Sequence, residues 1–170
     1  MQILLHCTKR VIDRLEIVNP PKLVTIDNLP FWNSWYCNLI PFGKMKCYLF
    51  THSITLLSFM IFEGKEDIKK TIETAFKYYL GKTFELENIP KSKIMSILFN
   101  MNGIVISKTN SKVILGTMND IAYSYLTGIT REDNYKPKTF SELVKDINDM
   151  PMSALKYSTP SKKLKEIFAF

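Results

Sequence analysis

Three consecutive runs of aromatic and branched residues constrain the fold of this chain more than any other feature. The runs are WYCNLIPF, KMKCYLFT and TLLSFMIF, and they lie between residues 35 and 62. Short turns separate them, at Gly43-Lys44 and at His52-Ser53. Because only short turns join them, we predict adjacent antiparallel strands over residues 35–42, 45–51 and 55–62.

Outside these runs, apolar residues recur with the helical period of 3.6 residues. The spacing predicts helices over residues 9–17, 68–79, 91–101 and 111–126, and two more that begin after Thr139 and Thr159. Thr8 is placed to cap the first helix, and Gly81 is placed to end the second. Further strands are predicted at 2–7 and 104–107.

Together these elements predict a single α+β domain over residues 1–170. Its sheet is expected to be small and mainly antiparallel, with a three-strand meander, the N-terminal strand and one later strand. Five to six helices are expected to pack on it. The 46% content of hydrophobic residues is enough to bury a core and excludes wholesale disorder.

The chain is basic, with a formal net charge of +7, which favours an acidic or polyanionic partner. Its three cysteines are an odd number without a CxxC motif, which is typical of a reducing compartment. The longest apolar run, 54–62, is far shorter than the roughly 20 residues of a membrane span. The N-terminal MQILLH lacks the basic flank of a signal peptide. We therefore expect a cytoplasmic protein that does not bind a membrane.

The segment KTNSKVILGTMND (108–120) resembles a phosphate-binding loop only superficially. Such a loop needs several glycines or a Lys-Ser/Thr pair after the last glycine, and neither is present. The apolar spacing instead places Gly116 in the second turn of a helix, where we expect it to allow close approach of a neighbouring element. Asn110 or Ser111 is the predicted N-cap, and Lys108 and Lys112 flank a helix end that can attract anions.

Motifs that carry catalysis or bind metal are scarce. His6 and His52 are the two histidines, and neither lies at ligand spacing from a cysteine or carboxylate, so we expect no metal and no cofactor. Cys7 or Cys37 could meet His52 in space, but no sequence feature orients such a pair. Glu63-Gly64-Lys65 matches the Glu-x-Lys of metal-dependent nucleases, although no upstream Asp accompanies it.

Four segments occur in a fixed order: CTKRVIDRL (7–15), WYCNLI (35–40) with KCYLFTH, KTNSKVILGTMND (108–120), and MPMSALKY (150–157) followed by Pro160. In them the chain resembles a family of small bacterial and phage proteins catalogued only as a domain of unknown function. It departs from that family with Lys112 where Arg is usual, Val113 where Ser is usual and Ala154 where Pro is usual. Lysine keeps the charge but loses the planar fork of arginine. The resemblance implies no activity, and it suggests a role in toxin–antitoxin systems, phage defence or counter-defence.

The polar residues of these segments are the candidate site. Trp35 and Asn38 lie three apart on one predicted strand, so they point to opposite faces, and Trp35 is the expected core residue. We hypothesise that a shallow anion-accepting or partner-docking site is formed by a polar set: Asn38, Lys108, Asn110, Lys112 and Ser153. The alternative is that these side chains only cap helices and satisfy backbone groups.

These features predict a non-enzymatic interaction protein that acts on a protein partner. The alternative is a nucleic-acid-binding protein, since aromatic residues neighbour lysines at several positions, for example at Tyr135-Lys136 and Lys156-Tyr157. A metal-dependent nuclease that uses Glu63 and Lys65 is a third hypothesis.

Overall fold

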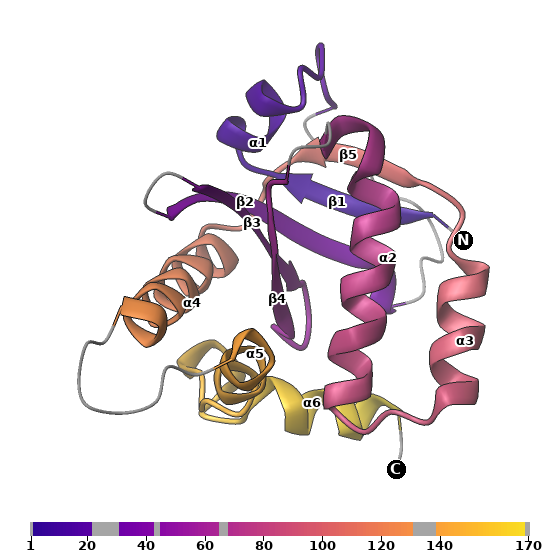
Figure 1. Cartoon of the computed structure of the whole chain (residues 1–170), viewed down its shortest axis with the longest axis vertical. Helices are drawn as coiled ribbons and strands as arrows, with labels where there is room; N and C mark the ends of the chain where they lie inside the picture. Colours follow the sequence, from indigo (N-terminus) through magenta and orange to yellow (C-terminus); the bar gives the residue numbers. More distant parts are fainter. Residues whose placement is uncertain (1, 22–30, 43–44, 65–67, 131–138, 169–170) are drawn as a thin grey trace.

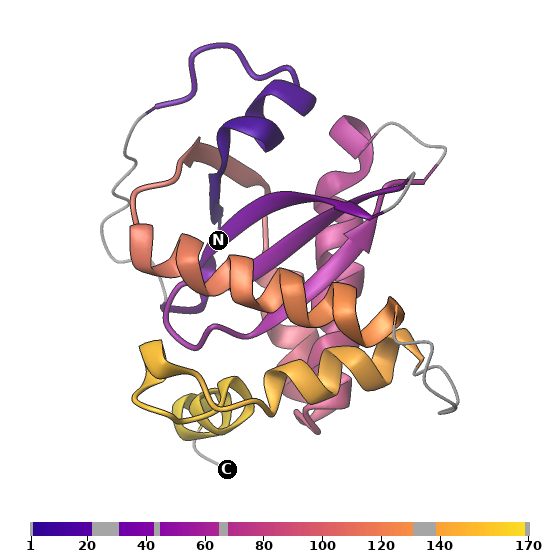
Figure 2. The ribbon, with the colours of Figure 1, turned by 90° about the vertical axis from the view of Figure 1, so that its left-hand side faces the viewer.

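A five-stranded sheet with helices on both faces organises the chain (Figures 1 and 2). The computed structural model describes residues 2–21, 31–42, 45–64, 68–130 and 139–168. The strands are β1 (Ile3–Cys7), β2 (Ser34–Phe42), β3 (Met45–His52), β4 (Ser58–Phe62) and β5 (Ile104–Lys108). The α-helices are α1 (Lys9–Arg14), α2 (Ile68–Leu86), α3 (Lys91–Asn100), α4 (Lys112–Thr130), α5 (Phe140–Asn148) and α6 (Pro160–Phe168). Short 3-10 helices are η1 (Phe31–Asn33) and η2 (Ser153–Leu155).

The strand order is β4-β3-β2-β1-β5, and the sheet is mixed. The predicted antiparallel pairing of the three central runs is confirmed, since β2 pairs with β3 and β3 with β4. The expectation of a mainly antiparallel sheet is wrong, because β1 pairs in parallel with both β2 and β5. Two parallel strands must be joined by a crossover connection. The residues of β1 and β5 do not indicate which strand the chain pairs with after that crossover.

The third central strand begins at Ser58 rather than at residue 55. The reason is a turn that follows β3. In it, His52 Nδ1 lies 2.8 Å from Thr55 Oγ1 and 3.1 Å from the Thr55 backbone nitrogen. The Thr55 hydroxyl in turn accepts from the N–H of Leu57 at 3.2 Å. These local bonds replace the strand ladder over residues 53–57.

Successive side chains along each strand point to opposite faces of the sheet, so the core has one part on each face. Trp35 and Phe50 are buried with the apolar residues of α1, α2 and α3, which confirms Trp35 as a core residue. Tyr36 and Leu49 are buried on the opposite face with the apolar residues of α4 and α5. Each face is therefore covered by its own set of helices, as Figures 1 and 2 show.

The two edges of the sheet differ. At the β4 edge, the buried Asn148 of α5 accepts a hydrogen bond from Ser58 N–H at 2.8 Å and donates one to the Ser58 carbonyl at 2.9 Å. A side-chain amide thus takes the place of a further strand at Ser58. The β5 edge has no such cover at its centre among the described residues.

Gly81 and Gly116 do not have the roles predicted for them. Helix α2 continues through Gly81 to Leu86, so the prediction that Gly81 ends it is wrong. A Cβ at Gly81 would lie 3.0 Å from Leu98 Cδ1, so this glycine is where α3 approaches α2 closely. Gly116 is helical as predicted, but a Cβ there would meet nothing within 4 Å, so the expected close approach is wrong.

We therefore expect Gly116→Ala to raise the free energy of unfolding by about 0.5–1 kcal/mol, because alanine costs less backbone entropy in a helix. Gly81→Leu should lower it by about 1–3 kcal/mol, because its side chain must displace Leu98. Urea denaturation of both variants measures these changes. A loss of stability in Gly116→Ala would show that α4 is packed against another surface there.

Candidate functional site

The carboxyl ends of β1 and β5 lie side by side, and the chain leaves them toward opposite faces of the sheet. After β1 it enters α1, whose Val11 and Ile12 pack on the α2 face. After β5 it enters α4, whose Met118 and Ile121 pack on the other face. Adjacent strands with diverging connections open a crevice at their carboxyl ends, where α/β sheets bind ligands. Figure 2 looks onto this edge, with α1 above and α4 across the middle.

Polar side chains that follow the ends of β1 and β5 meet side chains from within β2 here. Thr8 occupies the N-cap position of α1 but makes no capping bond with its side chain. Its hydroxyl instead donates to Asn38 Oδ1 at 3.1 Å. The Tyr36 hydroxyl donates to Asn110 Oδ1. Asn38 lies two residues beyond Tyr36 and therefore on the same face of β2. The structure thus places Asn38 and Asn110 on a common side of the sheet, as the site hypothesis requires.

Helix α4 begins at this edge with open backbone donors. Ser111 is its N-cap, since the Ser111 hydroxyl accepts from the N–H of Ile114 at 3.3 Å. The N–H groups of Lys112 and Val113 have no partner among the described residues. Lys112 itself is exposed. The start of α4 therefore combines a lysine side chain with free N–H groups at the positive end of the helix dipole.

The other two predicted site residues lie apart from this group. Lys108 is exposed at the end of β5, but strand alternation puts its side chain on the face of Ile104 and Ile106, opposite to Ser107. Ser153 is exposed on η2, which contacts α4. No hydrogen bond between described residues joins Ser153 to Asn38 or Asn110. The predicted set thus divides into a convergent group, Asn38, Asn110 and Lys112, and two outlying residues.

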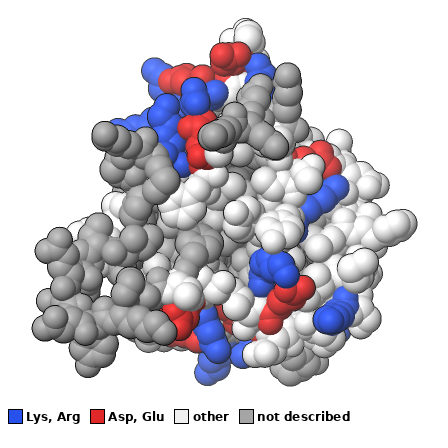
Figure 3. Space-filling model, in the orientation of Figure 1, with Lys and Arg blue, Asp and Glu red and all other residues white. Residues whose placement is uncertain are grey.

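The prediction missed two cations, Lys9 and Arg10, which are exposed in the first turn of α1. They follow β1 directly, and its parallel pairing with β5 brings them to the edge where Lys108 and Lys112 lie. We call Lys9, Arg10, Lys108 and Lys112 the basic edge. None of the four forms an ion pair within the part of the chain that the structure describes. Figure 3 shows Lys and Arg gathered over α1, with carboxylates among them. The parallel pairing of β1 with β5 places Lys9 and Arg10 at this end of the sheet, and the sequence does not reveal that pairing.

A buried histidine supports this edge from within the sheet. Ser107 Oγ lies 2.8 Å from His6 Nδ1, and Ser34 Oγ lies 3.3 Å from His6 Nε2. The Tyr36 ring lies 4.8 Å from the imidazole, centroid to centroid. Ser107 is fully buried, and both ring nitrogens of His6 lie against serine hydroxyls rather than against a carboxylate of the described residues, unlike the histidine of a hydrolytic triad. His6 instead ties β5, β1 and β2 together just below the polar group.

Burial lowers the pKa of His6 below its ordinary value of 6.5. Between the folded-state pKa and 6.5, the unfolded chain binds more protons at this position than the native chain. We therefore expect the free energy of unfolding to fall as the pH is lowered from 6.5 toward the folded-state pKa of His6. Denaturation at a series of pH values, on wild type and His6→Gln, measures this. An identical pH dependence in both proteins would show that His6 titrates freely.

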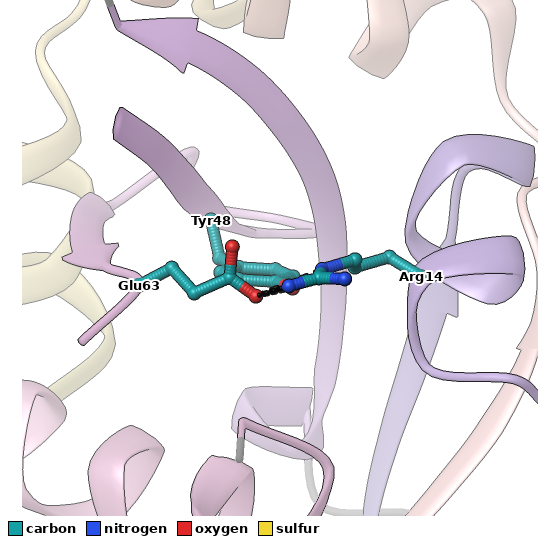
Figure 4. A network of polar contacts seen from close by, with 3 residues as sticks. All are labelled: Arg14, Tyr48 and Glu63. Atoms are coloured by element: carbon teal, nitrogen blue, oxygen red, sulfur yellow. Dashed lines mark hydrogen bonds and ion pairs between the residues drawn. The ribbon is translucent and has the colours of Figure 1, made fainter. Parts of the chain in front are cut away.

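Glu63, which the nuclease hypothesis assigns to metal binding, contacts Arg14 and Tyr48 instead (Figure 4). Glu63 Oε1 lies 2.6 Å from Arg14 Nη2 and accepts from Arg14 Nε at 2.8 Å. The Tyr48 hydroxyl lies 3.5 Å from the same oxygen, and burial, the largest cause, raises the pKa of Tyr48 to about 12. A metal ion at Glu63 would have to compete with the guanidinium for the charge of this carboxylate. Lys65 lies outside the described residues.

The described contacts of His52 are with Thr55 and Trp35 and not with Cys7 or Cys37, the partners that the sequence suggested. His52 Nδ1 lies 2.8 Å from Thr55 Oγ1, and the His52 ring is tilted by 54° against the Trp35 ring with their centroids 5.0 Å apart. Cys7 and Cys37 are register partners on neighbouring strands, both buried. Burial raises the pKa of Cys37 well above its ordinary value, which keeps this thiol protonated and unreactive.

Comparison with known proteins agrees with the resemblance carried by the four segments. Within the described residues, no helix has the length and hydropathy needed to cross a membrane. No curated protein and no solved structure matches the chain. A family model described as a domain of unknown function matches residues 4–163, which is most of the chain. The chain therefore belongs to the family DUF6933.

Proposed function

We propose that the chain is a non-enzymatic interaction protein that binds an acidic segment of a partner protein on the basic edge. One observation carries this proposal: the four cations of the basic edge have no carboxylate partner within the described residues. Several lysines elsewhere are neutralised by nearby glutamates: Lys69 by Glu16, Lys77 by Glu73, Lys82 by Glu85 and Lys163 by Glu166. The free N–H groups at the start of α4 add donors for a carboxylate at the same edge.

The surface beside the basic edge favours a protein over a nucleic acid. Beyond Lys112, helix α4 has a single charged residue, Asp120. Its outward side carries large apolar or aromatic side chains, with Val113 exposed by 67% and Tyr123 by 69%. A nucleic acid would need cations to follow its phosphates along this helix. Carboxylates at the edge and apolar contacts along α4 suit a protein partner.

A charge-reversal pair tests the proposal. Lys9→Glu with Lys112→Glu should weaken binding of a labelled glutamate-rich peptide by about tenfold or more, because like charges then face each other. The matched control is Lys91→Glu with Lys162→Glu, which makes the same charge change at exposed positions on α3 and α6. The control should bind within about twofold of wild type. Equal weakening by both pairs would show non-specific attraction and contradict the proposal.

The same proteins test the nucleic-acid alternative, which the four cations also support. Duplex DNA is titrated at low and at physiological salt. If DNA binds more tightly than the peptide, with a steep loss of affinity at higher salt that depends on Lys9 and Lys112, the nucleic-acid function replaces the protein-binding one. A toxin–antitoxin or phage-defence setting is part of the proposal on the strength of the family resemblance.

A further inference from the structure

β5 is an edge strand with open backbone groups on its outer side. Its inner side pairs with β1: Ile3 N–H donates to the Gly103 carbonyl at 3.0 Å, and Thr109 N–H to the Cys7 carbonyl at 3.2 Å. Alternation then directs the N–H and C=O groups of Ile104, Ile106 and Lys108 away from the sheet. Lys108 N–H donates to the Pro21 carbonyl at 3.0 Å. The outer groups of Ile104 and Ile106 have no partner in the described chain.

An apolar groove runs beside these open groups. It has a volume of about 290 Å³, and its apolar lining comes from Leu15, Ile17, Ile72, Ile104 and Ile106. Lys69 and Glu73 also line it, and each is already paired, Lys69 with Glu16 at 3.1 Å and Glu73 with Lys77 at 2.8 Å. The groove therefore offers apolar surface without unpaired charge, on the face toward which Ile104 and Ile106 point.

Proteins normally protect an edge strand with charge, proline, a bulge or a covering element. Asn148 provides such cover for Ser58 at the β4 edge. In β5, by contrast, Ile104, Val105 and Ile106 follow one another half-buried, and the first charged residue is Lys108. The unpaired N–H and C=O groups of Ile104 and Ile106 thus lie beside three half-buried branched side chains. This arrangement favours addition of a strand.

We propose that β5 accepts an extended segment of the partner protein as a sixth strand, with one apolar side chain in the groove and acidic residues at the Lys108 end of β5. This rests on the proposed function and specifies how the partner binds. The open N–H and C=O groups of Ile104 and Ile106 require an extended backbone as occupant. The outward N–H of Lys108 is already bonded to the Pro21 carbonyl, so the added strand pairs at Ile104 and Ile106 and leaves β5 before Lys108. Its acidic residues then lie at the end of β5 that is nearest the basic edge.

The probe is a peptide in which leucine alternates with threonine before a run of glutamates. It is compared with the same peptide N-methylated on every second residue of the alternating part, in either register. N-methylation removes a donor and blocks strand pairing, so one register should weaken binding by about tenfold and the other should have little effect. Equal affinity of all three peptides would overturn the proposal.

Two protein variants complete the test. Ile106→Pro removes an outward N–H, which edge strands tolerate, together with an isoleucine side chain that lines the groove, and Ile104→Lys places a charge at the groove. Both should fold and both should lose peptide binding by about tenfold. If binding depends on Lys9 and Lys112 but not on these variants, the basic edge stands and the sixth strand is excluded. If sedimentation shows a dimer that Ile106→Pro dissociates, the occupant is a second copy of this chain, and the partner strand is excluded as well.

Discussion

Asn148→Ala is expected to lower the free energy of unfolding by about 2–5 kcal/mol. The Asn148 amide accepts from Ser58 N–H and donates to the Ser58 carbonyl, and both residues are fully buried. Alanine removes both bonds and leaves two buried backbone groups without partners, each of which carries its full desolvation cost. The β4 edge also loses the contact that holds α5 against it. Chemical denaturation followed by circular dichroism measures the change.

Asn119→Ala is the matched control, because Asn119 is exposed on α4. Its effect should stay within about 0.5 kcal/mol. Asn148→Asp should resemble Asn148→Ala, since a carboxylate cannot donate to the Ser58 carbonyl and would be buried with its charge. If Asn148→Ala were as stable as the control, water or a neighbouring side chain would have to satisfy Ser58, and the account of this edge would fail.

Phe76→Ala is expected to destabilise the fold by about 3–5 kcal/mol. Phe76 extends from α2 and is fully buried among three aromatic residues of the central strands. Its ring centroid lies 5.4 Å from that of Trp35, 5.3 Å from that of Phe50 and 5.5 Å from that of Phe59. Removing it leaves a cavity between α2 and β2, β3 and β4 that the rigid sheet cannot fill.

Phe99→Ala provides the comparison, since Phe99 of α3 is 85% exposed. It makes the same chemical change without opening a cavity and should cost at most about 0.5 kcal/mol. Phe76→Leu should fall between the two, because leucine keeps part of the buried volume. Equal thermal midpoints for Phe76→Ala and Phe99→Ala would mean that α2 is not anchored to the sheet through Phe76.

The sequence was sufficient to predict elements whose own residues determine them. The aromatic and branched runs between residues 35 and 62 are β2, β3 and β4, paired antiparallel as predicted. The turn predicted at Gly43-Lys44 lies outside the described residues. The Thr139 capping box is present at α5, and Pro160 is the first residue of α6. Local composition could not show that β1 and β5 are parallel neighbours, because that pairing depends on where distant segments return to the sheet. The roles of Gly81 and Gly116 likewise depend on which helix packs beside them.

For the candidate site, the local sequence likewise indicated some of the residues but not how distant segments come together. Asn38 and Asn110 were assigned to a common site, and the structure places them on one side of the sheet, with Tyr36 bonded to Asn110. Lys9 and Arg10 were not in the predicted set, since only the parallel register of β1 and β5 brings the start of α1 to the same end of the sheet as Lys108. Helix periodicity alone made them ordinary surface residues of α1.

Titration of the isotopically labelled protein with the glutamate-rich peptide, followed by amide chemical shifts, tests the central claim most directly. The basic edge lies at the carboxyl ends of β1 and β5, so the shifts should concentrate at residues 8–10 and 108–113. Lys91 and Lys162 lie on α3 and α6 and should remain unchanged. Shifts concentrated on α3 and α6, or spread evenly over all exposed lysines, would contradict a binding face at this edge.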